Sequence, residues 1–276
     1  MQLRRVSAQD DRGTYDWWGA GSYRGAALVK GVILAGGTGS RLDPLTRVTN
    51  KHLLPVGRVP MIYYPLRTLV EAGLQDIMIV TGGNNAGMFL ELLGNGREFG
   101  LRHLDYAYQE RPGGIAEALG MARDFVGEAR CVVHLGDNIL SGSIRPYVEQ
   151  FRAQPAGAMI LLHEVPHPEA YGVPALAANG TITQIIEKPA EPPSPYAVVG
   201  VYMYDAQVWD IIPALRPSGR GELEITDVNN AYLQRGQLAY GILEGEWGDA
   251  GESLDSYFVA GEMAWRSGLF AGVGGC

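Results

Sequence analysis

The sequence predicts an α/β protein with a doubly wound, mostly parallel, mixed sheet and helices on both faces. Three observations lead to this fold class. Short apolar runs of strand length recur along the first half of the chain, helical patterns lie between them, and glycine follows each run within a few residues. Alternation of this kind places parallel strands in one sheet, with the connecting helices on its two faces.

The first half of the chain supplies the clearest elements. Residues 31–35 form a continuous apolar run, which predicts a buried parallel strand. Apolar residues at helical spacing over 61–72 stop at a glycine, and 77–80 form a second apolar run. A further helical pattern over 115–125 leads into a third predicted strand at 131–135. Together they predict a sheet built from strand–helix–strand units.

The second half of the chain is richer in strands. Residues 158–165, 181–187 and 197–204 have strand character, and a helical pattern follows over 207–215. Residues 189–195 form a proline-rich loop that is too short to separate domains. We therefore expect this half to complete the same sheet.

The domain organisation follows from where these patterns begin and end. Residues 30–268 are predicted to form a single domain with two halves, the first over about 30–140 and the second over about 141–268. Residues 1–29 precede the first convincing element and are expected to be an extension, and 269–276 are expected to be a tail.

The extension contains a tryptophan pair, Trp17 and Trp18, without helical or strand periodicity. A disordered arm and an upstream start codon are two interpretations. The third is that both tryptophans dock on a neighbouring subunit. The sequence leaves the three open.

Composition and charge exclude several classes of protein. The chain has 276 residues, 38 of them glycine, and a net charge of −8 without a run of like charges. Duplex nucleic acid and anionic membranes are therefore poor partners. Cys131 and Cys276 give neither a disulfide framework nor a metal-binding spacing. No apolar stretch has the length of a spanning helix or the form of a signal peptide, so we expect a cytoplasmic protein.

A glycine-rich loop follows the first predicted strand. A Walker A loop would need a Gly-Lys-Ser/Thr ending, and a dinucleotide fingerprint would need glycine in place of Leu42. What remains is a loop whose backbone amides and arginine suit a phosphate, although a glycine turn with a solvated arginine is the alternative. The loop comprises Leu34, Ala35, Gly36, Gly37, Thr38, Gly39, Ser40 and Arg41.

A lysine about ten residues further on, Lys51, completes a more specific pattern. The glycine loop, Arg41 and Lys51 together resemble the sugar-1-phosphate nucleotidyltransferase family, and most closely its glucose-1-phosphate thymidylyltransferases. The likeness extends from residue 30 to about 268. It implies a Rossmann-like nucleotidyltransferase fold, with a nucleotide-binding half over about 30–140 and a sugar-binding half over about 141–268.

The resemblance implies which residues bind the nucleotide. Gln109 lies in a stretch that is similar to the family's base-recognition loop, and a side-chain amide matches the donor and acceptor edge of a pyrimidine imide. His52 stands next to Lys51, where it would contact phosphate or base. The implied nucleotide-binding residues are Leu34, Ala35, Gly36, Gly37, Gly39, Ser40, Arg41, Lys51, His52, Gln109, Pro112, Gly114 and Asp137.

Two aspartates are implied to hold Mg²⁺. Asp137 follows the third predicted strand, and Asp249 lies in a tight loop far along the chain. Taken singly, each is better explained as a turn residue or a helix cap. As a pair that matches two family motifs in order, they supply the hard oxygen ligands that magnesium prefers.

The sugar phosphate side is implied by motifs in the second half. Glu187 would accept hydrogen bonds from sugar hydroxyls, and Lys188 would bind the sugar phosphate. Residues 219–227 form a further family stretch, in which Arg220 either contacts the sugar phosphate or makes a structural ion pair. The implied residues are Asn138, Tyr171, Gly172, Glu187, Lys188, Val199, Gly200, Tyr202 and Arg220.

The implied reaction condenses dTTP with α-D-glucose 1-phosphate to give dTDP-glucose and pyrophosphate, with Mg²⁺ as cofactor. Arg41, Lys51, Asp137 and Lys188 would carry the catalysis by neutralising charge. The alternatives are the same chemistry with UTP or another sugar phosphate, a silent subunit that binds nucleotide sugars, and a glycosyltransferase whose metal motif residues 136–138 resemble.

Two expectations concern assembly and regulation. Members of the family are commonly homotetramers or dimers, which implies a homo-oligomer. Longer members continue past the equivalent of residue 268 with helices that help build a regulatory nucleotide site, and here eight residues follow. We therefore expect weak or absent feedback inhibition by a dTDP-sugar.

Overall fold

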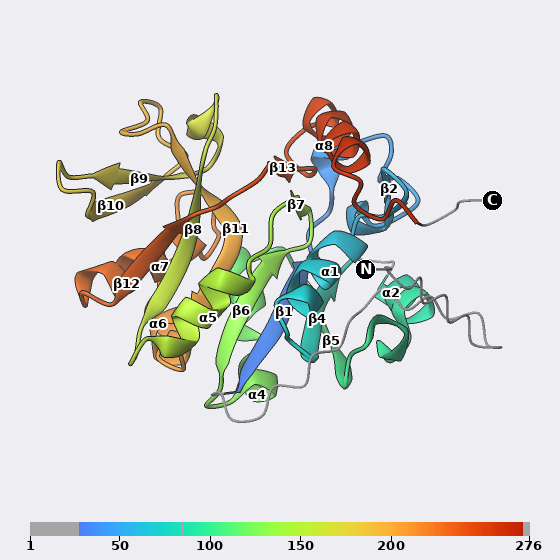
Figure 1. Ribbon diagram of the computed structural model, residues 1–276, viewed down its shortest axis with the longest axis horizontal. Helices are drawn as coiled ribbons and strands as arrows, with labels where there is room; N and C mark the ends of the chain where they lie inside the picture. Colours follow the sequence, from blue (N-terminus) through green and yellow to red (C-terminus); the bar gives the residue numbers. More distant parts are fainter. Residues whose placement is uncertain (1–27, 84–85, 273–276) are drawn as a thin grey trace, which may run out of the picture.

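A seven-stranded sheet forms the centre of the computed structural model, which describes residues 28–83 and 86–272 (Figure 1). The strand order is β12-β8-β11-β6-β1-β4-β5. Only β11 runs antiparallel to its neighbours in this sheet, so the predicted mostly parallel, mixed sheet is confirmed. The strands are β1 (Val29–Ala35), β4 (Asp76–Gly82), β5 (His103–Gln109), β6 (Arg130–Leu135), β8 (Ala158–Glu164), β11 (Tyr196–Tyr204) and β12 (Leu238–Ile242).

Helices cover both faces of the sheet because the strand side chains alternate between two apolar clusters. Ile33 packs in the cluster with α1 (Tyr63–Glu71), α2 (Ala86–Leu93) and α5 (Arg145–Ala153). Its neighbour Val32 packs in the opposite cluster. The helices of that second face are α3 (Ile115–Gly120), α4 (Arg123–Val126), α6 (Val208–Ile211) and α7 (Ile225–Gln234).

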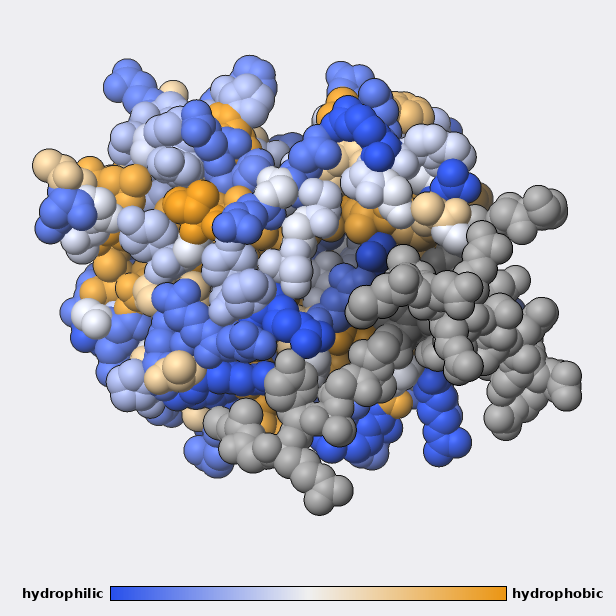
Figure 2. All heavy atoms as spheres, in the orientation of Figure 1, coloured by the Kyte–Doolittle hydropathy of each residue, from blue (hydrophilic) through white to orange (hydrophobic). Residues whose placement is uncertain are grey.

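Smaller elements stand beyond one edge of the sheet (Figure 1). They are the hairpin of β9 (Gly172–Leu176) and β10 (Ile182–Glu187), the antiparallel pair of β7 (Asn138–Leu140) and β13 (Trp247–Asp249), the short pair of β2 (Pro55–Val56) and β3 (Val59–Pro60), and α8 (Leu254–Arg266). A capping box between Ser253 and Ser256 begins α8, which packs in a third apolar cluster. In the space-filling view the outline is notched between the β9–β10 hairpin and α8 (Figure 2).

Several elements differ from the sequence predictions. The strand expected at 181–187 forms, but it pairs with β9 outside the central sheet, and its outer side chains stay exposed. The helix expected over 115–125 is broken into α3 and α4, and that over 207–215 is shortened to α6 and a 3-10 turn. The edge strand β5 was missed because its side chains alternate with polar ones and lack a continuous apolar run.

Some predictions lie outside the described residues. Trp17, Trp18 and Cys276 are among them, so the three interpretations of the extension stay predictions. Cys131 is buried and makes no disulfide. Among the helices of the described ranges, none has both the length and the apolar content to cross a membrane.

The parallel strands place three polar or glycine-rich chain segments at one edge of the sheet. β1, β4, β5 and β6 are parallel, so their carboxyl ends lie side by side. The glycine loop follows β1, Gln109 ends β5, and Asp137 follows β6. Ligands in open α/β sheets bind at this edge.

Candidate functional site

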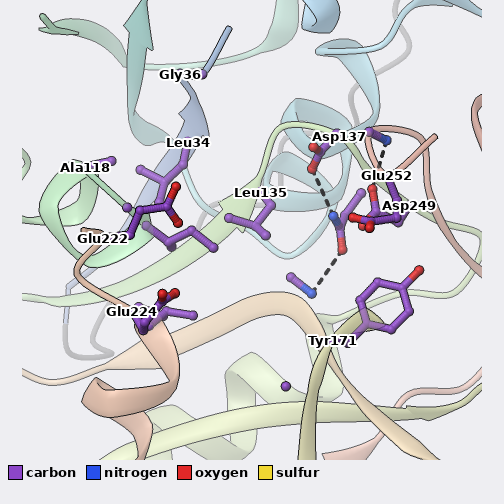
Figure 3. Close-up of a pocket in the computed structure, with 18 of the residues that line it drawn as sticks. Leu34, Gly36, Ala118, Leu135, Asp137, Tyr171, Glu222, Glu224, Asp249 and Glu252 are labelled. Atoms are coloured by element: carbon purple, nitrogen blue, oxygen red, sulfur yellow. Dashed lines mark hydrogen bonds between the residues drawn. The ribbon is translucent and has the colours of Figure 1, made fainter. Parts of the chain in front are cut away.

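A pocket of about 400 Å³ opens at the carboxyl edge of the sheet and draws residues from both halves of the chain (Figure 3). It brings together nearly all of the residues predicted from the sequence. Those are Leu34, Gly36, Gly37, Gly39, Ser40, Arg41, Lys51, His52, Gln109, Pro112, Gly114, Asp137, Asn138, Tyr171, Gly172, Glu187, Lys188, Gly200, Tyr202, Arg220 and Asp249.

Two predicted residues do not line the pocket. The side chains of Ala35 and Val199 are fully buried in the apolar cluster beneath α1 and α5. Each lies one position from a lining residue, Gly36 and Gly200. Side chains alternate between the faces of a strand, so a motif of adjacent residues does not point as a block into one cavity.

Sequence reasoning also missed several lining residues. Trp247 and Gly251 flank the second aspartate motif, and Glu222, Glu224 and Thr226 belong to the 219–227 stretch. The sequence motifs identified these segments, but they did not show which side chains of each segment face the pocket. The most important omission is Glu252, which had no signal of its own in the sequence.

An ion pair between Lys51 and Asp137 lies at the centre of the pocket. Lys51 Nζ is 2.5 Å from Asp137 Oδ2, and the two side chains are only 16% and 14% exposed. Burial disfavours the charged form of both groups, but the attraction between the two opposite charges is stronger than this effect. The pKa of Lys51 is therefore raised and the pKa of Asp137 is lowered. Both groups therefore stay charged at neutral pH.

Asp249 is brought to Asp137 by the pairing of two strands. In the β7–β13 pair, Asp249 stands opposite Asn138, and the Ala250 amide donates to the Asp137 carbonyl at 2.9 Å. Burial and the negative charge of Asp137 raise the pKa of Asp249 to about 7. Two buried carboxylates that repel each other form a site whose charge favours a divalent cation.

The glycine loop leaves backbone open to the pocket. Gly37 has a φ of +93°, and a Cβ placed on it would meet nothing within 4 Å. Gly39, by contrast, is packed against Thr46, which would lie 2.9 Å from such a Cβ. Gly37 therefore offers both an unusual backbone conformation and space for a bound group, while Gly39 serves the loop's own packing.

Arg41 and Lys188 come from opposite halves of the chain and share one carboxylate. Arg41 Nη1 donates to Glu252 Oε2 at 2.5 Å, and Lys188 Nζ lies 3.8 Å from Glu252 Oε1. Lys188 also has a φ of +44°, the left-handed region that lysine rarely adopts. Figure 3 shows Glu252 beside Asp137 and Asp249 on one side of the pocket, with Glu222 and Glu224 on the other.

The side-chain amide of Gln109 has a fixed orientation. Gln109 is 7% exposed, and its Nε2 donates to Glu117 Oε1 at 3.1 Å. A carboxylate only accepts, so the amide nitrogen must face Glu117 and the carbonyl oxygen must face away. A Cβ on Gly36 would lie 2.8 Å from that oxygen. The Gln109 carbonyl is thus directed toward the glycine loop.

Gly114 joins this region to the second half of the chain. It has a φ of +97°, and a Cβ on it would lie 2.4 Å from the Leu223 carbonyl oxygen. Hydrogen bonds on either side, from the Leu223 amide to the Gly113 carbonyl and from the Ala116 amide to the Leu223 carbonyl, hold the two segments together. Only glycine permits this approach without displacing backbone.

The acidic residues near the β9–β10 hairpin are already paired. Arg220 Nη2 lies 3.3 Å from Glu187 Oε1 and 3.0 Å from Glu224 Oε2, so the structural ion pair left open by the sequence is present. Glu187 also accepts from Thr226 Oγ1 at 2.6 Å. These contacts fix the Glu187 carboxylate at the pocket wall.

Asn138 links three parts of the pocket. Its Oδ1 accepts from the Gly200 amide at 3.0 Å and from Trp247 Nε1 at 2.7 Å, and its Nδ2 donates to Asp137 Oδ1 at 3.0 Å. Trp247 in turn stacks edge-on against Tyr171, with ring centroids 5.0 Å apart. Asn138 therefore holds Asp137 in place and is largely engaged within the protein.

His52 is a neutral residue behind the charged centre. It is 1% exposed, and its Nδ1 lies 2.8 Å from Asn50 Oδ1. Burial, reinforced by the positive charge of Lys51, lowers the pKa of His52 to about 3. It adds no positive charge to the pocket at neutral pH.

Acidic side chains outnumber basic ones around the pocket. The basic lining residues are Arg41, Lys51, Lys188 and Arg220, and the acidic ones are Asp137, Glu187, Glu222, Glu224, Asp249 and Glu252. A cation that enters with a polyanion would offset this excess of negative charge.

Comparisons with known proteins agree on one family. The nucleotidyl transferase family model matches residues 30–264. A glucose-1-phosphate thymidylyltransferase of Actinoplanes sp. is 48% identical over 230 residues, which cover 82% of this chain and 75% of that protein. Another from Neisseria meningitidis is 40% identical over 260 residues, covering 87% and 90% of the two chains.

Solved structures show the same fold. A crystal structure of a Bacillus anthracis protein assigned as a glucose-1-phosphate thymidylyltransferase superimposes with a TM-score of 0.82 at 53% identity, covering 86% of this chain and 96% of that one. A UDP-glucose pyrophosphorylase complexed with UDP-glucose superimposes with a TM-score of 0.75 at 22% identity, covering 87% and 99%. The second likeness supports the fold alone.

Proposed function

Because the chain belongs to the nucleotidyl transferase family, we propose that it condenses dTTP with α-D-glucose 1-phosphate to give dTDP-glucose and pyrophosphate. The relatives named for this reaction, at 40–48% identity, support the choice of substrates. The observation that carries the proposal is the pocket, in which Arg41, the Lys51–Asp137 pair and Lys188 surround one cavity.

The reaction proceeds by a single displacement. A phosphate oxygen of glucose 1-phosphate forms a bond to the α-phosphorus of dTTP, and the bond from that phosphorus to the bridging oxygen of pyrophosphate breaks. The attacking phosphate is an anion at neutral pH, so the protein supplies no base and no nucleophile. Catalysis then rests on holding two mutually repelling anions in line.

Each basic residue of the pocket centre has a distinct role. Arg41 and the amides around Gly37 bind the pyrophosphate that leaves. Lys188 binds the phosphate of the sugar. Lys51 stays protonated beside Asp137, so its positive charge screens the α-phosphate throughout the reaction.

Divalent cations generally support catalysis in this family, and the pocket fits Mg²⁺. Asp137 and Asp249 would hold the ion. Among the described residues, no cluster of three or more His, Cys, Asp or Glu side chains suits a metal, and magnesium characteristically uses one or two carboxylates together with substrate phosphates. When bound, the ion neutralises phosphate charge. It also relieves the repulsion between the two aspartates.

Base and sugar would bind at opposite ends of the cavity. The Gln109 carbonyl accepts from the imide N–H that thymine and uracil share, and Gly114 gives the base room to approach. Glu187, Tyr171 and the Gly172 backbone line the hexose, with the aromatic ring against an apolar face of the sugar. We further propose a homo-oligomer, dimer or tetramer, which light scattering measures.

UTP is the second candidate nucleotide, because the imide edge read by Gln109 is common to both bases. A panel of dTTP, UTP, dCTP and ATP, crossed with several sugar 1-phosphates and monitored by pyrophosphate release, tests the proposal. We expect the highest kcat/KM for dTTP with glucose 1-phosphate. Higher values for another pair would reassign the substrates, and no release from any pair would favour a non-catalytic subunit that binds nucleotide sugars.

A further inference from the structure

Glu252 joins two cations that the reaction assigns to different substrates. It lies in the loop between β13 and α8, directly before the Ser253 cap. Its Oε2 accepts from Arg41 Nη1 at 2.5 Å, and its Oε1 lies 3.8 Å from Lys188 Nζ. Arg41 follows β1 and Lys188 follows β10, so this one carboxylate spans the boundary between the nucleotide and sugar halves.

We infer that Glu252 is an internal counter-ion that stands in for a phosphate between Arg41 and Lys188, and that the phosphates of the substrates must displace it. This inference rests on the proposed function of the pocket. A carboxylate matches a phosphate in having two anionic acceptor oxygens that can each take a donor. Without such a group, the two cations of the empty pocket would repel each other.

The exposure of these side chains indicates that the contact is readily exchanged. Arg41 is 54% exposed, Lys188 32% and Glu252 29%, so water and salt screen the pairs. Partly exposed ion pairs contribute about 1 kcal/mol or less. The Lys51–Asp137 pair is far more buried, with side chains 16% and 14% exposed. Glu252 is thus the carboxylate that the substrate phosphates displace.

Displacement has a measurable consequence for affinity. Pyrophosphate can accept hydrogen bonds from Arg41 only after Arg41 has separated from Glu252. While the Glu252 carboxylate remains nearby, its negative charge also repels the pyrophosphate. Removing the charge from Glu252 without changing its shape should therefore tighten the binding of phosphates. A residue whose role was to position Arg41 for the ligand would behave in the opposite way.

The test is the affinity for inorganic pyrophosphate, measured by calorimetry in metal-free buffer with chelator. We expect Glu252→Gln to lower the dissociation constant roughly three- to tenfold relative to the unmodified chain. Glu222→Gln is the matched control. It removes the same charge from the same pocket, but the Glu222 carboxylate contacts Arg220 instead of Arg41. Its dissociation constant should change less than twofold.

Each outcome decides the inference. Unchanged or weaker binding by Glu252→Gln, or an equal gain in Glu222→Gln, would overturn it. If Glu252→Gln fails to fold, Glu252→Ala takes its place, since it also removes the carboxylate between the two cations and should shift affinity in the same direction. This experiment measures only the binding of pyrophosphate, so it is independent of the substrate panel. If the panel shows no thymidylyl transfer, the proposed function is refuted, while the affinities of the Glu252 and Glu222 variants still test the inference.

Discussion

The centre of the pocket and its base end are built on different principles. At the centre, Lys51 and Asp137 form a buried ion pair, and the pKa of Asp249 beside them is raised to about 7. At the base end, which comprises Gln109, Gly114 and Glu117, one amide is oriented and one backbone approach is very close. The centre should therefore be sensitive to single charges, and the base end to single methyl groups and to the direction of one amide.

The largest effect should come from removing charge at the centre. Asp137→Asn keeps the shape of the side chain but leaves Lys51 without its counter-ion and Asp249 without its partner for the metal. We expect turnover, measured by pyrophosphate release, to fall about 10³-fold or more. Asp210→Asn, an exposed change on α6, should keep the normal rate. A near-normal rate for Asp137→Asn would remove Asp137 from the mechanism.

A methyl group should be nearly as damaging at the base end. In Gly114→Ala, the new Cβ would press on the Leu223 carbonyl and the φ of +97° would be strained. We expect the free energy of unfolding to fall by about 2–4 kcal/mol and kcat/KM for dTTP to fall markedly. Denaturant unfolding measures the first effect and steady-state kinetics the second.

Gly127→Ala separates strain from collision. Gly127 also has a positive φ, +62°, but a Cβ on it would meet nothing within 4 Å. Its free energy of unfolding should fall by about 1–2 kcal/mol, from strain alone, with kcat/KM unaffected. Equal losses in the two variants would show that the approach to Leu223 contributes nothing.

Lowering the pH should reveal how the centre excludes further positive charge. Burial lowers the pKa of His52 to about 3 and that of His134 to about 4, below the value of about 6.5 in an unfolded chain. At these two residues the unfolded state then binds more protons, so their contribution to the free energy of unfolding falls as the pH drops below about 6.5, while Asp249, whose pKa is raised to about 7, contributes with the opposite sign. Each histidine should cost about 2 kcal/mol at pH 5. His52→Gln should remove its share of this loss, and an unchanged pH dependence would contradict a buried neutral His52.

The smallest effect expected is a change in base preference. In Glu117→Gln the partner of Gln109 can both donate and accept, so the two amides can reverse together and present an N–H to the base. We expect kcat/KM for dCTP relative to dTTP to rise about tenfold, with activity on dTTP retained. The exposed Glu110→Gln should leave the ratio unchanged. No change in Glu117→Gln would mean that the Gln109 carbonyl does not read the base.

In both regions the sequence predicted some residues and missed the partners that hold others in place. The fold class followed from apolar runs, and Asp137 and Gln109 were found because strand ends and family motifs mark them. The contacts of Glu252 and Glu117 depend on loops that are far apart along the chain or on the register of one helix, and no local pattern encodes them. For the same reason, the hydrogen bonds by which the Asn138 amide joins β7, β11 and β13 were not predicted, and its expected contact with the sugar stays a prediction.

The most direct measurement of the central claim is pyrophosphate release from dTTP in the presence and absence of glucose 1-phosphate. A single displacement at a pocket without a protein nucleophile predicts one pyrophosphate for each dTDP-glucose when both substrates are present. It predicts none from dTTP alone, even at enzyme concentrations that would reveal a single turnover. A burst of one pyrophosphate per enzyme molecule without the sugar phosphate would contradict the account, because it would require a covalent nucleotidyl-enzyme.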